Sequence, residues 1–190
     1  METKRIADAF SAHRAVLEKT EDLILPIAEM AEICVDALQK GHKILLCGNG
    51  GSAADAQHIA AELVGRFHRE RRSLPAIALT TDTSILTSVG NDYSYDDVFS
   101  RQVEGLGEAG DVLWCITTSG NSENVLRAAD VAKKKQMTVI ASLGKDGGKA
   151  VPLCDALFIV PSDSTARIQE MHILAAHAIC EVIDETNWDL

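Results

Sequence analysis

Short apolar runs that alternate with longer segments of helical periodicity constrain the fold of this chain more than any other feature. The runs cover residues 44–47, 76–79, 112–116, 138–143 and 156–160. Such alternation predicts a parallel sheet whose strands are joined by right-handed helical crossovers. Because the runs are almost continuously apolar, helices should cover both faces of the sheet. We therefore expect a doubly wound α/β fold with about five parallel strands.

Helical segments are predicted at both ends of the chain. The first forty residues show helical spacing up to Gly41, and a long last helix is expected from about residue 164 to residue 185. A chain of 190 residues fits one ordinary domain. We expect a single domain over residues 1–190, in which a helical arm at residues 1–40 serves oligomerisation and residues 41–190 form the α/β core.

Charge and apolar content exclude two classes of partner. Asp and Glu total 28 against 18 Lys and Arg, a net charge of −10, which argues against nucleic acids and anionic membranes as partners. No apolar run approaches the ~18 residues that cross a bilayer, and no secretory leader is visible. The five cysteines lie singly in apolar stretches, as expected of reduced core thiols in a cytoplasmic protein. Any anionic ligand must then be held by local features.

Two loops could provide such an anion site. Residues 48–52 read GNGGS after the first run, and residues 117–122 read TTSGNS after the third. Glycines let the backbone approach a ligand, a helix N-terminus favours negative charge, and hydroxyls donate to phosphate. A tight turn with a helix cap is the simpler interpretation of either loop alone. Because parallel strands end at one edge of a sheet, the two loops together favour a phosphate site.

A dinucleotide site is the rival interpretation of the first loop. Gly48, Gly50 and Ala53 fit a relaxed dinucleotide-binding pattern, which requires an acidic residue about 20 positions later. The second run instead ends near Asp82, which lies 34 positions after Gly48. The pattern also gives the second loop no role, so we favour a phosphate or similar anion site over a dinucleotide site.

Polar side chains on two helices could carry chemistry. Asp55, His58, Glu62 and Arg66 follow helical spacing and form one polar stripe after the first loop. A solvated face explains such a stripe equally well, but a carboxylate here could act as a general base, and a His–Glu pair could bind a metal. Arg66 is the member of the basic cluster 66–72 that we expect near a ligand.

The last helix carries two histidines in different settings. His177 lies opposite its apolar stripe, with Gln169 on the same flank. His177 is therefore either exposed or directed into another site, such as that of a second subunit. His172 falls near the apolar stripe and is expected to be a core or interface histidine.

Several segments carry a family resemblance over nearly the whole chain. They are CGNGGSAADAQH at 47–58, TTDTS at 80–84, VGND at 89–92, TSGNS at 118–122 and RIQEMH at 167–172. Together they resemble the sugar isomerase (SIS) domain family, and within it the bacterial phosphoheptose isomerases. The resemblance implies a homotetramer with active sites between subunits. It also implies conversion of sedoheptulose 7-phosphate to D-glycero-D-manno-heptose 7-phosphate through an enediol, the first step of ADP-heptose and lipopolysaccharide precursor synthesis.

The resemblance also implies roles for individual residues. Glu62 corresponds to the catalytic base and His177 to its acid/base partner. One zinc ion per subunit is implied, with no nucleotide cofactor, and its ligands would be His58, Glu62, Gln169 and His177. The resemblance, the loops and the polar stripe together give these expected substrate contacts: Asn49, Gly50, Gly51, Ser52, Glu62, Arg66, Asn91, Asp92, Thr117, Thr118, Ser119, Ser122 and Gln169.

A non-catalytic function is the alternative. The chain also resembles the DnaA initiator-associating protein, a relative of the same fold that binds a protein partner. That relative does not preserve the positions of Glu62 and His177, whereas this chain has both. We therefore favour the enzyme.

Overall fold

Five parallel strands form the centre of the molecule. The computed structural model describes residues 2–188. Its strands lie in the order β2-β1-β3-β4-β5, and every neighbouring pair is parallel. All five predicted strands are confirmed, with ends that differ from the prediction by one residue at most. They are β1 (Ile44–Gly48), β2 (Ala76–Ala78), β3 (Val112–Thr117), β4 (Thr138–Gly144) and β5 (Ala156–Val160).

Helices cover both faces of this sheet, as the apolar strands predicted. The helices are α1 (Glu2–Leu17), α2 (Ile24–Gln39), α3 (Gly51–Val64), α4 (Thr83–Asp92), α5 (Ser100–Leu106), α6 (Glu123–Lys134) and α7 (Thr165–Glu185). Within residues 2–188 there are also three 3₁₀ turns: η1 (Glu21–Leu23) between α1 and α2, η2 (Tyr95–Asp97) between α4 and α5, and η3 (Gly148–Leu153) between β4 and β5. Apolar residues of α2, α3 and α7 pack on one face around Trp114 and Phe158. Residues of α5, α6 and η3 pack on the other face around Leu113 and Val139.

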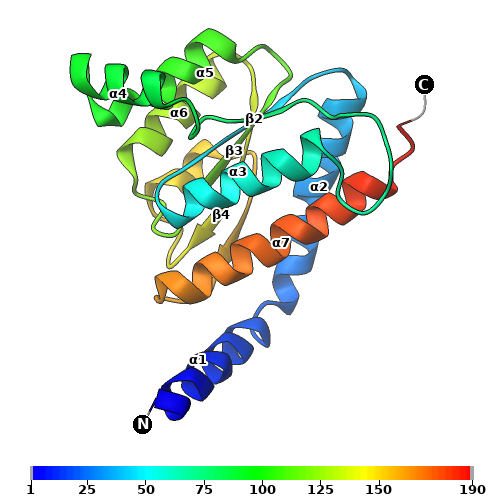
Figure 1. Ribbon diagram of the computed structural model, residues 1–190, viewed down its shortest axis with the longest axis vertical. Coiled ribbons are helices and arrows are strands. Elements are labelled where there is room, and N and C mark those ends of the chain that lie inside the picture. Colours follow the sequence, from blue (N-terminus) through cyan, green and yellow to red (C-terminus); the bar gives the residue numbers. More distant parts are fainter. Residues whose placement is uncertain (1, 189–190) are drawn as a thin grey trace.

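The first forty residues form two helices instead of one continuous segment. A break at residues 18–20 and the turn η1 separate α1 from α2. Met30, Cys34 and Leu38 of α2 are buried in the core, whereas Val16 is the buried residue of α1. Figure 1 shows α1 extending away from the body of the molecule. The part of the expected arm that stands clear of the sheet is therefore α1.

The strand order fixes where a ligand can bind. Strand β2 lies on one side of β1 and β3 lies on the other, so the chain changes direction across the sheet between β1 and β3. In open parallel sheets the loops at the carboxyl ends of the two strands flanking such a point diverge and leave a crevice. The loops after β1 and β3 are the two in which the sequence predicted an anion site.

The helices of residues 2–188 differ from membrane spans. None of them combines the length and the apolar composition that crossing a bilayer requires.

Candidate active site

The loop after β1 is held in place by side-chain amides. Gly48 pairs with Ile116 of β3 at the carboxyl end of the sheet. The Asn49 amide donates to Asn124 Oδ1 at 2.8 Å, and the Asn124 amide donates back to Asn49 Oδ1 at 2.9 Å. The hydroxyl of Tyr95 donates to the same Asn49 oxygen at 3.3 Å. The first loop is thus joined at Asn49 to the start of α6, which directly follows the second loop.

Glycines in the first loop allow close approach of the backbone. Gly50 has a φ of +58°, a left-handed conformation that favours glycine. A Cβ added at Gly51 would collide with Nε2 of Gln169, so the α7 amide lies against the start of α3. No side chain caps α3 at Gly50. The positive end of the helix dipole is therefore presented by backbone alone, as an anion site requires.

The loop after β3 gathers hydroxyl groups. The hydroxyls of Thr117 and Ser122 lie 3.3 Å apart, and Ser119 Oγ accepts from the backbone N–H of Asn121 at 3.2 Å. Thr118, Ser119 and Ser122 are half-buried. Their hydroxyls can thus donate to a phosphate that enters the crevice.

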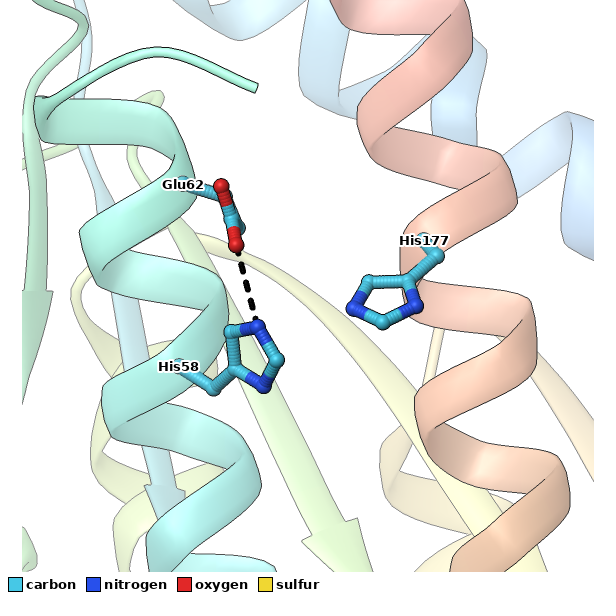
Figure 2. A group of neighbouring side chains, drawn as sticks. All are labelled: His58, Glu62 and His177. Atoms are coloured by element: carbon cyan, nitrogen blue, oxygen red, sulfur yellow. Dashed lines mark hydrogen bonds and ion pairs between the residues drawn. The ribbon is translucent and has the colours of Figure 1, made fainter. Parts of the chain in front are cut away.

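A second group of polar side chains lies between α3 and α7. Nε2 of His58 lies 3.0 Å from Oε1 of Glu62, within the same helix. The ring centroids of His58 and His177 are 5.0 Å apart. Figure 2 shows His177 of α7 pointing toward His58 and Glu62 of α3. His177 is half-buried and faces polar side chains of its own chain. Of the two settings predicted for it, exposure is therefore wrong.

These three side chains could hold a metal ion. One donor atom from each of His58, Glu62 and His177 lies within 4.8 Å of the others. Two imidazoles and one carboxylate form the protein ligand set of many catalytic zinc sites, which keep a further position open. The donor chemistry of this cluster therefore fits zinc.

Gln169 lies apart from this cluster. Its amide lies against Gly51 at the start of α3. Gly51 precedes His58 by seven residues, which places the two about 10 Å apart along the helix axis. The expected four-ligand set thus divides into three residues that the structure brings together and one that lies two helical turns away.

The remaining predicted residues are distributed around the site. Ser52 is buried. Arg66 is exposed and lies beyond the end of α3 at Val64, so it does not continue the predicted polar stripe of that helix. It lies near the His68 carbonyl and Glu70. Asn91 and Asp92 are exposed at the end of α4, where the Asn91 amide donates to Asp92 at 2.7 Å. Because Tyr95 follows closely and reaches Asn49, the end of α4 lies near the first loop.

Two titratable groups near these loops are perturbed by burial. Desolvation raises the pKa of Asp55, although His58 opposes this shift, and one Asp55 carboxylate oxygen is buried without a partner. Burial lowers the pKa of His172 to about 4, although its hydrogen bond to the Leu143 carbonyl opposes the shift. His172 is only 2% exposed and is a core histidine, one of the two settings predicted for it.

Other residues of the site had little signal in the sequence. Asn124 and Tyr95 support Asn49, and the Phe67 ring lies 5.6 Å from the His177 ring. Asn124 belongs to the first turn of α6, and its position after the hydroxyl loop could have suggested a contact across the crevice. Phe67 comes from an irregular segment and Tyr95 from the short turn η2, where periodicity does not report which side chains face a site.

Comparison with known proteins agrees with this architecture. A family model described as "SIS domain" matches residues 10–144. The phosphoheptose isomerase of a Nitratiruptor species is 61% identical over 175 residues, which cover 92% of this chain and 94% of that protein. The phosphoheptose isomerase 1 of Campylobacter jejuni is 55% identical over 174 residues, covering 92% and 94% respectively.

A solved structure shows the same similarity in three dimensions. The phosphoheptose isomerase of Neisseria gonorrhoeae superposes with a TM-score of 0.93 at 49% identity, covering 98% of this chain and 100% of that one. The chain thus belongs to the SIS domain family, whose fold it has. Within that family it belongs with the phosphoheptose isomerases, and it is a sugar-phosphate isomerase.

Proposed function

We propose that this enzyme converts sedoheptulose 7-phosphate to D-glycero-D-manno-heptose 7-phosphate through an enediol. The observation that carries the proposal is the cluster of His58, Glu62 and His177. The same fold also places two loops suited to an anion at one edge of the sheet. An aldose–ketose isomerisation moves a proton between adjacent carbons, so it needs a base for carbon and an acid/base for oxygen. The names of the relatives support a seven-carbon sugar phosphate.

The two loops bind the phosphate in this proposal. The chain carries a net charge of −10, and dipoles and hydroxyl donors take the place of a basic patch. Asn49, fixed by Asn124 and Tyr95, holds the first loop against the start of α6, which follows the second loop. The glycines at positions 50 and 51 let backbone N–H groups approach the ligand.

Glu62 and His177 transfer the protons. Glu62 removes the proton from one carbon and returns it to the next, while His177 moves protons between the sugar oxygens. His58 donates to the Glu62 carboxylate at 3.0 Å and orients it toward the space that His177 faces. A positioned base of this kind contributes about 10²–10⁴-fold to the rate.

Zinc is part of the proposal, held by His58, Glu62 and His177. Gln169, predicted as a fourth ligand, lies about two helical turns from these residues in its own chain. When bound, it would polarise the sugar carbonyl as a Lewis acid. The residues around it belong to rigid helices, which hold ligands in place better than loops do.

The proposed enzyme is a homotetramer with active sites between subunits. Glu62 lies eleven positions after Gly51, which is about 16 Å along α3. The carbon chain of a heptose, built from bonds of about 1.5 Å, spans less than about 10 Å. This mismatch supports a site in which the phosphate loops and the acid/base pair come from different copies. A cytoplasmic location and a role of the product in lipopolysaccharide synthesis remain predictions.

The test is turnover of sedoheptulose 7-phosphate by the purified protein, followed by NMR. We expect the aldose product, loss of activity after chelation, and recovery on addition of zinc. Absence of turnover in zinc-loaded protein would reject the substrate assignment. Unchanged turnover in a preparation shown to be metal-free would remove zinc from the mechanism.

A further inference from the structure

A buried ion pair links the segment after α3 to the end of α7. Nε of Arg71 donates to Oδ1 of Asp184 at 3.0 Å, and the two side chains are only 5% and 3% exposed. Exposed ion pairs hold their partners loosely, whereas a buried pair with satisfied hydrogen bonds fixes one geometry. Neither residue belongs to the proposed catalytic set.

The rest of the Arg71 guanidinium binds the end of α3. One of its terminal nitrogens donates to the Glu62 carbonyl at 2.8 Å, and the other donates to the Leu63 carbonyl at 2.9 Å. Carbonyls in the last turn of a helix have no partner within the helix. Arg71 therefore caps α3 at the residue whose carboxylate is the proposed base.

Asp184 connects Arg71 and the segment at residues 68–69 to α7. It lies seven residues after His177 on α7, about two turns along the same helix. Its Oδ2 accepts from the backbone N–H groups of His68 and Arg69. These bonds also hold the segment from which Phe67 packs against the His177 ring.

We propose that Arg71, held by Asp184, is a positioning residue that sets the separation between Glu62 on α3 and His177 on α7. The planar guanidinium reaches Asp184 and both carbonyls at once, which the single ammonium of a lysine does not. Reacting groups must be held within a fraction of an ångström. A displacement of Arg71 would therefore move Glu62 relative to His177 and slow catalysis, while leaving the phosphate loops unchanged. This inference rests on the proposed roles of Glu62 and His177.

The test compares Arg71→Lys with Arg69→Lys in the zinc-loaded full-length protein. Arg69 lies in the same segment, and its exposed side chain donates to the Glu185 carbonyl at 3.3 Å. For Arg71→Lys we expect kcat to fall about tenfold to a hundredfold, with KM changed by less than about threefold. The imidazole nitrogen signals of His58 and His177 should shift in Arg71→Lys alone.

Wild-type kcat and unchanged imidazole signals in folded Arg71→Lys would overturn the inference, as would a loss explained entirely by a smaller folded fraction. Should Arg71→Lys not fold, the isosteric Asp184→Asn variant carries the same expectations and the same refutation. Failure of the proposed function has separate signs, because the wild type would then not turn over sedoheptulose 7-phosphate, or Glu62→Gln would retain turnover if Glu62 is not the base. The imidazole spectra would still decide whether Arg71 positions the two helices.

Discussion

The side chains of His58, Glu62 and His177 show what residue spacing can and cannot reveal. The i,i+4 spacing predicted that His58 and Glu62 share one face of a helix, and they lie 3.0 Å apart. A helical wheel also placed His177 away from its own apolar stripe. It could not show that α3 lies beside α7, because that contact depends on how the crossovers pack on the sheet.

At the same scale, His172 should make the protein sensitive to acid. The folded protein holds this imidazole neutral, with a pKa of about 4 against about 6.5 when unfolded. Below pH 6.5 the unfolded chain therefore binds more protons, and the unfolding free energy falls as pH drops toward 4. The full loss is about 3 kcal/mol by linkage.

Urea unfolding of the wild type and of His172→Gln between pH 4 and pH 7 measures this effect. Glutamine can still donate to the Leu143 carbonyl but does not titrate. The variant should lose most of the pH dependence in this window. An equal slope for both proteins would show that His172 is not responsible.

At the scale of elements, the five strands could be predicted because buried strands leave continuous apolar runs. The break between α1 and α2 was missed because apolar spacing continues on both sides of it. Pro26 lies in the first turn of α2, a position that tolerates proline. Together with the polar residues 18–22, it was a signal for a new helix start.

The loop after β3 depends on one close contact between elements. Gly120 has a φ of +62°, and a Cβ there would collide with the Gly147 carbonyl oxygen. Gly41 has a φ of +84° with open space around it. Gly41→Ala should therefore cost about 1 kcal/mol of strain, whereas Gly120→Ala must also displace backbone.

We expect Gly120→Ala to lower the unfolding free energy more than Gly41→Ala and to raise KM for the sugar phosphate. Thermal unfolding of both variants measures the stability loss, and steady-state kinetics measures KM. Equal stability losses, with KM unchanged in both, would contradict the role of Gly120 in shaping the phosphate loop.

At the scale of the whole molecule, large apolar residues remain exposed on α1 and at the start of α2. Phe10 is 73% exposed, Ile24 is 65% exposed and Leu25 is 80% exposed. A cavity of about 420 Å³ lies between this region and α7, lined by Leu17 and Leu174 among others. Apolar surface of this kind is typical of an interface, in keeping with the proposed tetramer.

Leu25→Asp should dissociate the proposed tetramer and reduce activity with it, because a charge would be placed in an apolar contact. Leu106→Asp, at the exposed end of α5 on the other face of the sheet, is the matched control. Light scattering after size-exclusion chromatography gives the mass. A Leu25→Asp protein with wild-type mass and activity would exclude this surface as the interface.

The central claim is that Glu62 moves a carbon-bound proton, and deuterium incorporation tests it most directly. Sedoheptulose 7-phosphate is incubated in D₂O with the zinc-loaded wild type, Glu62→Gln and the control Glu104→Gln, a change at an exposed residue of α5. The wild type and the control should form aldose labelled at C2, whereas Glu62→Gln should be slower by about 10²–10⁴-fold. Labelled aldose formed by Glu62→Gln at the wild-type rate would contradict the account.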